Sequence, residues 1–154
     1  MSAGTDTAMD ELFREVILDH ARRPRNHGAL PDPTAHAEGM NPVCGDAIAI
    51  DLVIIGGRVE VIAFKGEGCS ISQASTSLMT ELVIGRSVEA ARDVTAKFRS
   101  MMMEGADPHP DLADLEALQG AARFPARVKC ALLGWNVFEE GIRQANTKRK
   151  EVSS

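Results

Sequence analysis

Two adjacent glycines between two β-branched runs constrain the fold of this chain more than any other feature. The stretch GDAIAIDLVIIGGRVEVIAFKGEG covers residues 45–68, with Gly56 and Gly57 at its centre. A two-residue Gly-Gly turn between such runs predicts a β-hairpin in which Ile55 lies opposite Arg58. Extended outward, this register gives one apolar sheet face. That face carries Ile48, Ile50, Leu52, Ile54, Val59, Val61 and Ala63.

The same register places potential metal ligands at the open end of the hairpin. It places Cys44 opposite Cys69, and Asp46, two residues after Cys44, points to the same face. Cys69 begins a predicted helix, and Cys130 lies in the first turn of the last predicted helix. Helix N-termini stabilise thiolates. Three thiolates and a carboxylate suit tetrahedral Zn²⁺ or an iron–sulfur cluster, and the residues alone leave that choice open. Three buried, inert cysteines are the alternative, which their positions at element ends disfavour.

The rest of the chain alternates helical patterns with breaks. Apolar periodicity, capping residues and glycine stops predict helices over residues 7–22, 70–84, 87–105 and 126–145, and a short strand near Ala35–Met40. Residues 105–126 form a proline-containing break around Leu112, Leu115 and Leu118. We expect this break to be a surface excursion beside the cysteines, either part of a partner contact or a passive insertion.

Length and composition narrow the class of protein. A chain of 154 residues predicts a single domain, 1–154, and we expect disordered ends at about 1–6 and 147–154. The net charge of −5 argues against nucleic acid as a partner. No apolar stretch is long enough to span a membrane, and no signal peptide is visible, so we expect a cytoplasmic protein. Three widely spread cysteines favour thiol chemistry or metal binding over disulfides.

Three motifs carry a resemblance to a known family. NPVCGD (41–46), GEGCSISQASTSLMTELVIGRS (66–87) and RVKCALLGW (127–135) resemble the U-type iron–sulfur cluster assembly proteins, the IscU and NifU-like group. Two features resemble its SufU branch: Lys129 stands where IscU proteins carry a histidine, and residues 105–126 look like a SufU-type insertion. The resemblance implies an IscU/SufE-like α+β fold, with an antiparallel sheet of about three strands and helices on one face.

The resemblance also implies a function. SufU-like proteins bind zinc, here through Cys44, Asp46, Cys69 and Cys130, and accept persulfide sulfur from a cysteine desulfurase of the SUF system. The chain would then be a sulfurtransferase in iron–sulfur cluster assembly, with a downstream SUF scaffold complex as a further partner. Two alternatives remain open: a scaffold that assembles a transient [2Fe–2S] cluster on the same ligands, and a non-catalytic, zinc-stabilised adaptor of the desulfurase.

Within that reading, Cys44 is the expected sulfur acceptor. It lies on a loop before a strand and beside Gly45, so its release strains no helix, whereas Cys69 and Cys130 lie at helix starts. Cys130 is the competitor, because related IscU proteins use the third cysteine. Arg127, three residues before Cys130, is a candidate for stabilising the released thiolate, with a solvated arginine as the alternative.

Overall fold

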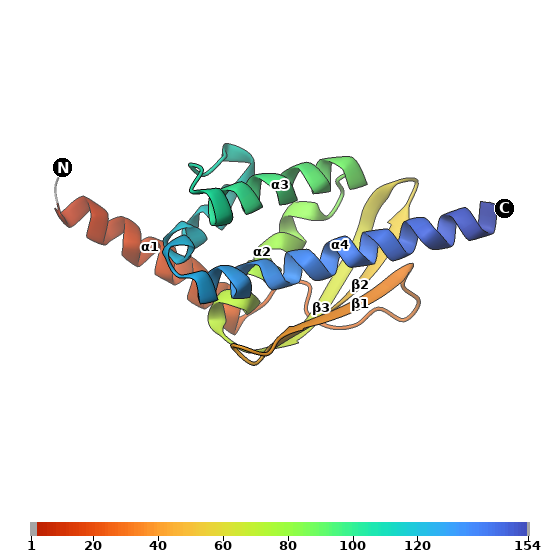
Figure 1. The fold of residues 1–154 in the computed structure, drawn as a ribbon, viewed down its shortest axis with the longest axis horizontal. Coiled ribbons are helices and arrows are strands. Elements are labelled where there is room, and N and C mark those ends of the chain that lie inside the picture. The colour runs from red at the N-terminus through yellow and green to blue at the C-terminus, as the bar shows by residue number, and fades with distance from the viewer. Residues whose placement is uncertain (1–2, 154) are drawn as a thin grey trace.

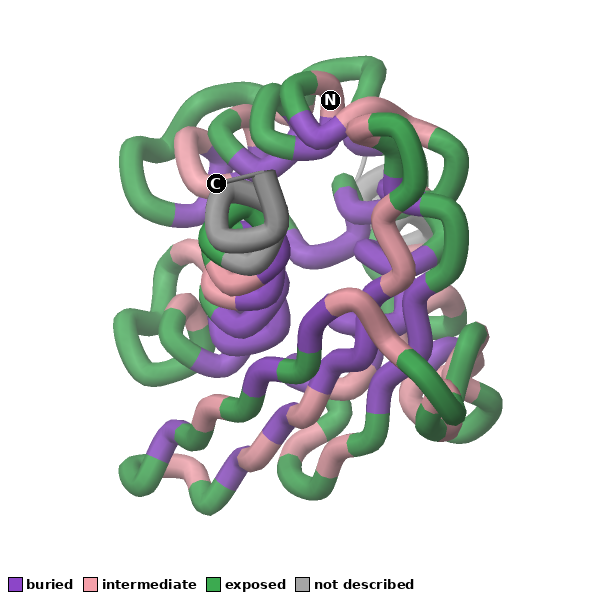
Figure 2. The backbone as a smooth tube through the Cα atoms, turned by 90° about the vertical axis from the view of Figure 1, so that its right-hand side faces the viewer, coloured by how far each residue is buried: buried purple, intermediate pink, exposed green. Residues whose placement is uncertain are grey.

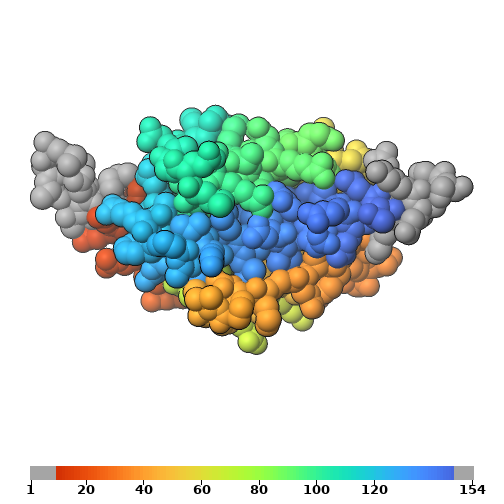
Figure 3. All heavy atoms as spheres, viewed as in Figure 1, coloured from red at the N-terminus to blue at the C-terminus, as the bar shows by residue number. Residues whose placement is uncertain are grey.

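A three-stranded antiparallel sheet and the helices on one of its faces make up the fold (Figure 1). The computed structural model describes residues 3–153, and side chains over residues 10–147. Its elements are α1 (Ala3–Arg22), β1 (Ala35–Asn41), β2 (Asp46–Ile55), β3 (Arg58–Glu67), α2 (Ser70–Val83), α3 (Val88–Glu104), the 3₁₀ helix η1 (Pro110–Arg123) and α4 (Pro125–Ser153). The expected α+β fold is confirmed. Figure 3 shows α3, α4 and β1 side by side on one face of the molecule.

Most element boundaries agree with the sequence signals. α1 ends at Arg22, and α2 begins directly after Cys69. Ser87 caps α3, its Oγ accepting the backbone N–H of Ala90 at 3.1 Å, and Gly105 ends α3 with a φ of 70°. The prediction of disordered ends covers residues 1, 2 and 154, which lie outside the described residues. The backbone of the other terminal residues belongs to α1 and α4, and that prediction stays untested.

The hairpin turn is confirmed, but the register beyond it is not. Ile55 pairs with Arg58 as predicted, and a β-bulge then shifts the pairing by one residue, so that Val53 lies opposite Val61. Glu60 is the extra residue of the bulge. The ladder ends at the pair Ala47–Glu67 and does not reach either cysteine.

The bulge changes which side chains of β3 enter the core. Val61, predicted to face inward, is 40% exposed, whereas Ile62 and Phe64 are buried against the helices. The run Val61-Ile62-Ala63-Phe64 is continuously apolar and therefore fits either register. The observed register turns Ile62 and Phe64 toward the helices in place of the smaller Val61 and Ala63, and Ala63 is buried on the other face at 6% exposure. More apolar surface is therefore removed from water, which explains the shift. Figure 2 shows the buried and exposed residues along the strands; in β3, Ile62, Ala63 and Phe64 are buried in succession.

Close contacts between α2 and α4 fix the two helices that carry Cys69 and Cys130. A Cβ added at Gly134 of α4 would lie 2.1 Å from Oγ1 of Thr76 on α2, so only glycine allows this approach. Ser75 Oγ donates to the carbonyl oxygen of Ala131 at 2.7 Å and accepts from Nε1 of Trp135 at 3.1 Å. These buried hydrogen bonds hold the second turn of α4 against α2, close to Cys130.

The prediction of a surface excursion over residues 105–126 is wrong for the 3₁₀ helix η1, whose leucines belong to the core, whereas residues 105–111 before them are exposed or partly exposed. Leu112, Leu115 and Leu118 are each 0% exposed, and η1 packs against α1, α2, α3 and α4. Leu115 and Leu118 share one side of a 3₁₀ helix because it has three residues per turn. The backbone is not helical at Ala113, where φ is 49° and ψ is −127°, so Leu112 reaches the core from a separate turn before this kink. The leucines of this proline-containing segment are therefore part of the hydrophobic core of the domain.

We expect Leu115→Ala to destabilise the protein by about 2–5 kcal/mol, because it opens a cavity where the side chain is 0% exposed. Denaturant unfolding measures this free energy. The exposed neighbour Glu116 gives the control, Glu116→Ala, for which we expect a change within about 0.5 kcal/mol. Equal effects from both substitutions would show that η1 is not packed as described.

In the described part of the chain, no helix has the length and apolar character needed to cross a membrane.

Candidate metal centre

The loop between β1 and β2, the start of α2 and the start of α4 meet at one end of the sheet (Figure 1). Asn41 and Asp46 form the last pair of the β1–β2 ladder and enclose a four-residue loop, 42–45, that carries Cys44. Gly45 allows the loop to turn with a φ of 71°. The hairpin thus places a cysteine at its tip and a carboxylate at its base.

The four candidate ligands predicted from the sequence lie together here. Ligand atoms of Cys44, Asp46 and Cys130 all lie within 4.8 Å of one another, and the sulfurs of Cys44 and Cys130 are 3.0 Å apart. The fourth, Cys69, has its sulfur 3.8 Å from Oδ2 of Asp46. Asp46 and Cys130 are buried, at 1% and 2% exposure, whereas Cys44 and Cys69 are partly exposed.

Asp46, and not Cys44, lies opposite the segment that leads from the end of β3 to Cys69. One step beyond the last ladder pair, the shifted register places Asp46 opposite Gly68. Asp46 Oδ1 accepts the backbone N–H of Cys69 at 2.7 Å. A Cβ at Gly68 would lie only 2.0 Å from that oxygen, and Gly68 has a φ of 132°. Gly68 is therefore part of the site, and sequence reasoning missed it.

Cys130 lies deeper in its helix than predicted. α4 begins at Pro125, so Cys130 is the sixth helical residue and lies in the second turn, where the helix N-terminus stabilises a thiolate less. Burial raises the pKa of the Cys130 thiol well above its ordinary value, and hydrogen bonds to Cys44 and Asp46 raise the pKa further. A buried cluster of two thiols and a carboxylate can become fully anionic only when a cation shares the site.

This donor set fits a metal. Thiolate sulfur and carboxylate oxygen are ligands that Zn²⁺ takes in tetrahedral sites. Cys44, Asp46 and Cys130 would hold the ion, and Cys69, beside Asp46, would supply the fourth donor. The same set of donors also suits an iron–sulfur cluster, so the arrangement by itself fixes the site and not the metal.

Asn41 is a second residue that the sequence reasoning missed. It is 8% exposed, and its Nδ2 donates to the sulfur of Cys130 at 3.8 Å. The period-2 pattern of β1 could have found it, because Ala35 and Ala37 are buried and Asn41 follows on the same face. A buried amide at the end of such a run signals a polar partner nearby.

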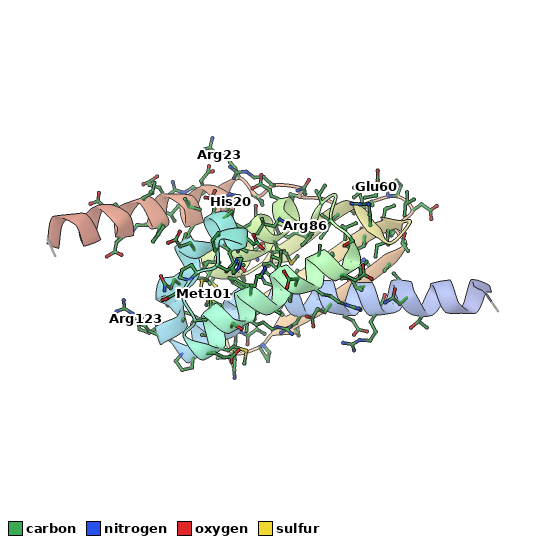
Figure 4. The ribbon with its side chains drawn as sticks, turned by 90° about the horizontal axis from the view of Figure 1, so that it is seen from above. His20, Arg23, Glu60, Arg86, Met101 and Arg123 are labelled. Carbon is green, nitrogen blue, oxygen red and sulfur yellow. The ribbon has the colours of Figure 1, made fainter. Side chains whose placement is uncertain are left out.

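Arg127 is an exposed residue of α4, next to Ala126, whose carbonyl oxygen is 4.0 Å from the Cys44 sulfur. Its guanidinium carbon is 5.9 Å from the centroid of the Phe124 ring, and no hydrogen bond joins it to a sulfur among the described residues. It lines a surface cavity of about 830 Å³ between α1, η1 and α4, together with Arg14 and Arg123. Figure 4 shows Arg123 directed outward from the body of the protein. The suggested thiolate-stabilising role of Arg127 stays a prediction.

Asp46 and Asp51 lie on β2 and point to opposite faces of the sheet, so a comparison of the two tests which face carries the candidate metal centre. Asp51 lies on the opposite face, where His36 Nδ1 approaches its Oδ1 at 2.5 Å and the N–H of Leu30 donates to Oδ2 at 2.9 Å. These contacts hold the loop before β1, and the hydrogen bond to Asp51, followed by that to Glu38, raises the pKa of His36.

We expect Asp46→Ala to lower metal affinity by about 100-fold, because a ligand and the bond to the Cys69 N–H are both lost. Asp51→Ala should keep the metal but destabilise the fold by about 1–3 kcal/mol. Metal content per chain and denaturant unfolding separate the two effects. Equal metal loss in both variants would contradict the assignment of the two faces.

Comparison with known proteins identifies the family. A family model described as the NifU-like N-terminal domain matches residues 12–152. The chain belongs to this family. Its NifU-like sequence is 45% identical over 135 residues to the zinc-dependent sulfurtransferase SufU of Bacillus subtilis, covering 87% of this chain and 91% of that protein. It is also 39% identical over 138 residues to the iron–sulfur cluster assembly scaffold protein IscU of Streptococcus pyogenes, covering 89% and 86%.

Solved structures show the same NifU-like fold. The N-terminal part of a nitrogen-fixing NifU-like protein from Brucella abortus superposes with a TM-score of 0.83 at 27% identity, covering 90% of this chain and 97% of that one. A SufU of Fervidobacterium islandicum, described as an iron–sulfur cluster assembly scaffold protein for the SUF system, gives a TM-score of 0.77 at 30% identity, covering 82% of this chain and 93% of that one. The family resemblance drawn from the three cysteine motifs is confirmed.

Proposed function

We propose that this chain is a zinc-dependent sulfurtransferase that accepts persulfide sulfur from a cysteine desulfurase of the SUF type. The observation that carries the proposal is the position of Cys44. Its thiol is partly exposed on the loop 42–45, yet lies 3.0 Å from the sulfur of the buried Cys130. The 45% identity to the Bacillus subtilis SufU supports the same activity.

The chemistry needs a thiolate that can leave the site. A bound zinc ion would keep the thiols deprotonated between transfers. The Cys44 thiolate attacks the outer sulfur of the desulfurase persulfide, and a new S–S bond forms to Cys44 Sγ. The S–S bond of the donor breaks, and its cysteine leaves as a thiolate with the electron pair. One neutral sulfur atom is transferred from the desulfurase cysteine to Cys44, and the total charge is unchanged.

Burial favours Cys44 over the competing Cys130 as the acceptor. Cys130 is 2% exposed and fixed in the second turn of α4, so a second protein's persulfide reaches it only after α4 or the loop moves. Cys44 lies on the short loop 42–45, outside any helix or strand. Val43, 71% exposed, precedes Cys44 in the loop, and Phe124, 54% exposed, lies two residues before Ala126, whose carbonyl oxygen is 4.0 Å from the Cys44 sulfur. Exposed apolar side chains of this kind suit a protein partner.

The test is to incubate the zinc-loaded protein with a SufS-type desulfurase and cysteine, and then to map the added sulfur by mass spectrometry of alkylated peptides. We expect the persulfide on Cys44 and none in a Cys44→Ser variant. Persulfide mainly on Cys130, or continued transfer in a metal-retaining Cys44→Ser variant, would refute the assignment. A protein that binds the desulfurase but takes no sulfur would instead be the zinc-stabilised adaptor.

A [2Fe–2S] scaffold is the second candidate. Its support is the 39% identity to the Streptococcus pyogenes scaffold IscU and a donor set that also suits a cluster. Lys129, exposed before Cys130, offers no imidazole ligand, which favours zinc. Metal analysis of protein purified without added metal or chelator separates the two: we expect one zinc per chain. A cytoplasmic location and delivery of sulfur to a downstream SUF scaffold complex belong to the same proposal.

A further inference from the structure

The side chain of Asn41 contacts both sides of the candidate metal centre. It ends β1, faces the helices and pairs with Asp46 across the ladder. Its Nδ2 donates to Cys130 Sγ at 3.8 Å, while its Oδ1 accepts the N–H of Val43 at 3.2 Å. Its backbone carbonyl accepts the N–H of Cys44 at 3.3 Å. One residue therefore holds the loop that carries Cys44 and also donates to the other sulfur.

These contacts make the two neighbouring sulfurs unequal. The two sulfurs lie 3.0 Å apart, with the Cys130 thiol as the donor to Cys44 Sγ. Apart from this contact, Cys130 Sγ accepts from the amide N–H of Asn41, whereas Cys44 Sγ faces the carbonyl oxygen of Ala126 at 4.0 Å. An N–H donor stabilises negative charge on sulfur and lowers its nucleophilicity, while a carbonyl oxygen offers a thiolate no such stabilisation. The Asn41 amide cannot turn its oxygen toward Cys130 without giving up Val43, so the donor stays in place.

From this asymmetry, and resting on the proposed function, we propose that Asn41 is a positioning residue that directs sulfur acceptance to Cys44. By donating to Cys130 Sγ it keeps that sulfur as the anchored ligand. By holding Val43 and Cys44 through its two oxygens it sets the loop from which Cys44 departs. The identity of the accepting cysteine then depends on a residue that is not itself a ligand.

The principal variant is Asn41→Ser. A serine hydroxyl still accepts from the N–H two residues on, but it is too short to donate to Cys130. Asn41→Asp is the second variant, because aspartate makes the same turn with an acceptor and has no N–H. Glu38→Gln is the control, since Glu38 is an exposed residue of the same strand that points away from the site.

The first measurement needs no desulfurase. The zinc-loaded proteins are treated with limiting iodoacetamide, and alkylation at each cysteine is followed by mass spectrometry. We expect the ratio of Cys130 to Cys44 modification to rise about tenfold in Asn41→Ser, the effect of losing one hydrogen bond to a charged group. The ratio in Glu38→Gln should equal that of the natural protein.

The second measurement is the distribution of persulfide after reaction with desulfurase and cysteine, which should shift toward Cys130 by a similar factor. An unchanged alkylation ratio in metal-loaded Asn41→Ser or Asn41→Asp overturns the inference. Loss of metal from both variants also overturns it, in favour of a purely structural role. If the natural protein takes no sulfur while the alkylation ratio still shifts, the proposed function fails and the effect of Asn41 on the sulfurs stands.

Discussion

Removal of the metal should lower the melting temperature by roughly 10 °C or more. Structural zinc contributes about 10–16 kcal/mol in zinc-finger peptides that have no fold without it. This chain has its own core, from Phe64 on the sheet to Trp135 on α4, so we expect only part of that stabilisation to appear. For a protein of this size, each kcal/mol of lost stability lowers the melting temperature by about 2–4 °C, so a loss of a few kcal/mol gives the expected change.

The loss should be large because the site joins segments that are distant in the chain. Cys44 and Asp46 belong to the β1–β2 hairpin, Cys69 lies directly before α2, and Cys130 lies in α4. Without a cation, Asp46 stays buried at 1% exposure beside two thiols, and its charge has lost its compensation. Opening the hairpin away from α4 then becomes the easiest way to hydrate the carboxylate.

Calorimetry before and after chelation, with metal content verified, measures the effect. The Asp46→Ala variant is the control: its metal affinity should be about 100-fold lower, so after dialysis to a metal concentration below its dissociation constant, chelator should change its melting temperature little. A natural protein that melts at the same temperature with and without metal would show that the cluster is not a structural metal site.

The sequence predicted the parts of this fold that depend on local chemistry. Gly56 and Gly57 turn the hairpin where expected, with φ values of 58° and 75°, because their positive φ depends on those two residues alone. Ser87 and Gly105 delimit α3 for the same reason. The four candidate ligands were found because cysteines at element ends stand out in a chain with only three.

The errors arose where distant packing decides between local alternatives. The run from Val61 to Phe64 fits two registers, and only the helices above the sheet select the one that buries Phe64. The wrong register still brought the right segments together, because a one-residue bulge moves Cys69 by about one strand position. Leu115 in a proline-containing stretch looked like loop, and its burial depends on space left between α1, α3 and α4.

Gly68→Ala should damage the site more than any substitution of a non-ligand residue. The new Cβ would lie 2.0 Å from Asp46 Oδ1 and 2.8 Å from its Cα, so Asp46 or the segment before Cys69 must move. Either movement breaks the 2.7 Å hydrogen bond between the Cys69 N–H and Oδ1 and separates two candidate ligands. We expect metal affinity to fall by about 100-fold or more, together with the melting temperature.

Part of any such effect comes from the backbone, and a second glycine isolates it. Gly85 also has a positive φ, 82°, but a Cβ there meets nothing within 4 Å, and it lies at the end of α2 away from the cysteines. Gly85→Ala should therefore cost about 1–2 kcal/mol of backbone strain and leave metal affinity unchanged. Competition with a chromogenic chelator gives the affinity of each variant, and denaturant unfolding gives its stability. If Gly68→Ala binds metal as tightly as Gly85→Ala, Asp46 does not occupy the position opposite Gly68, and the arrangement of ligands around it must be different.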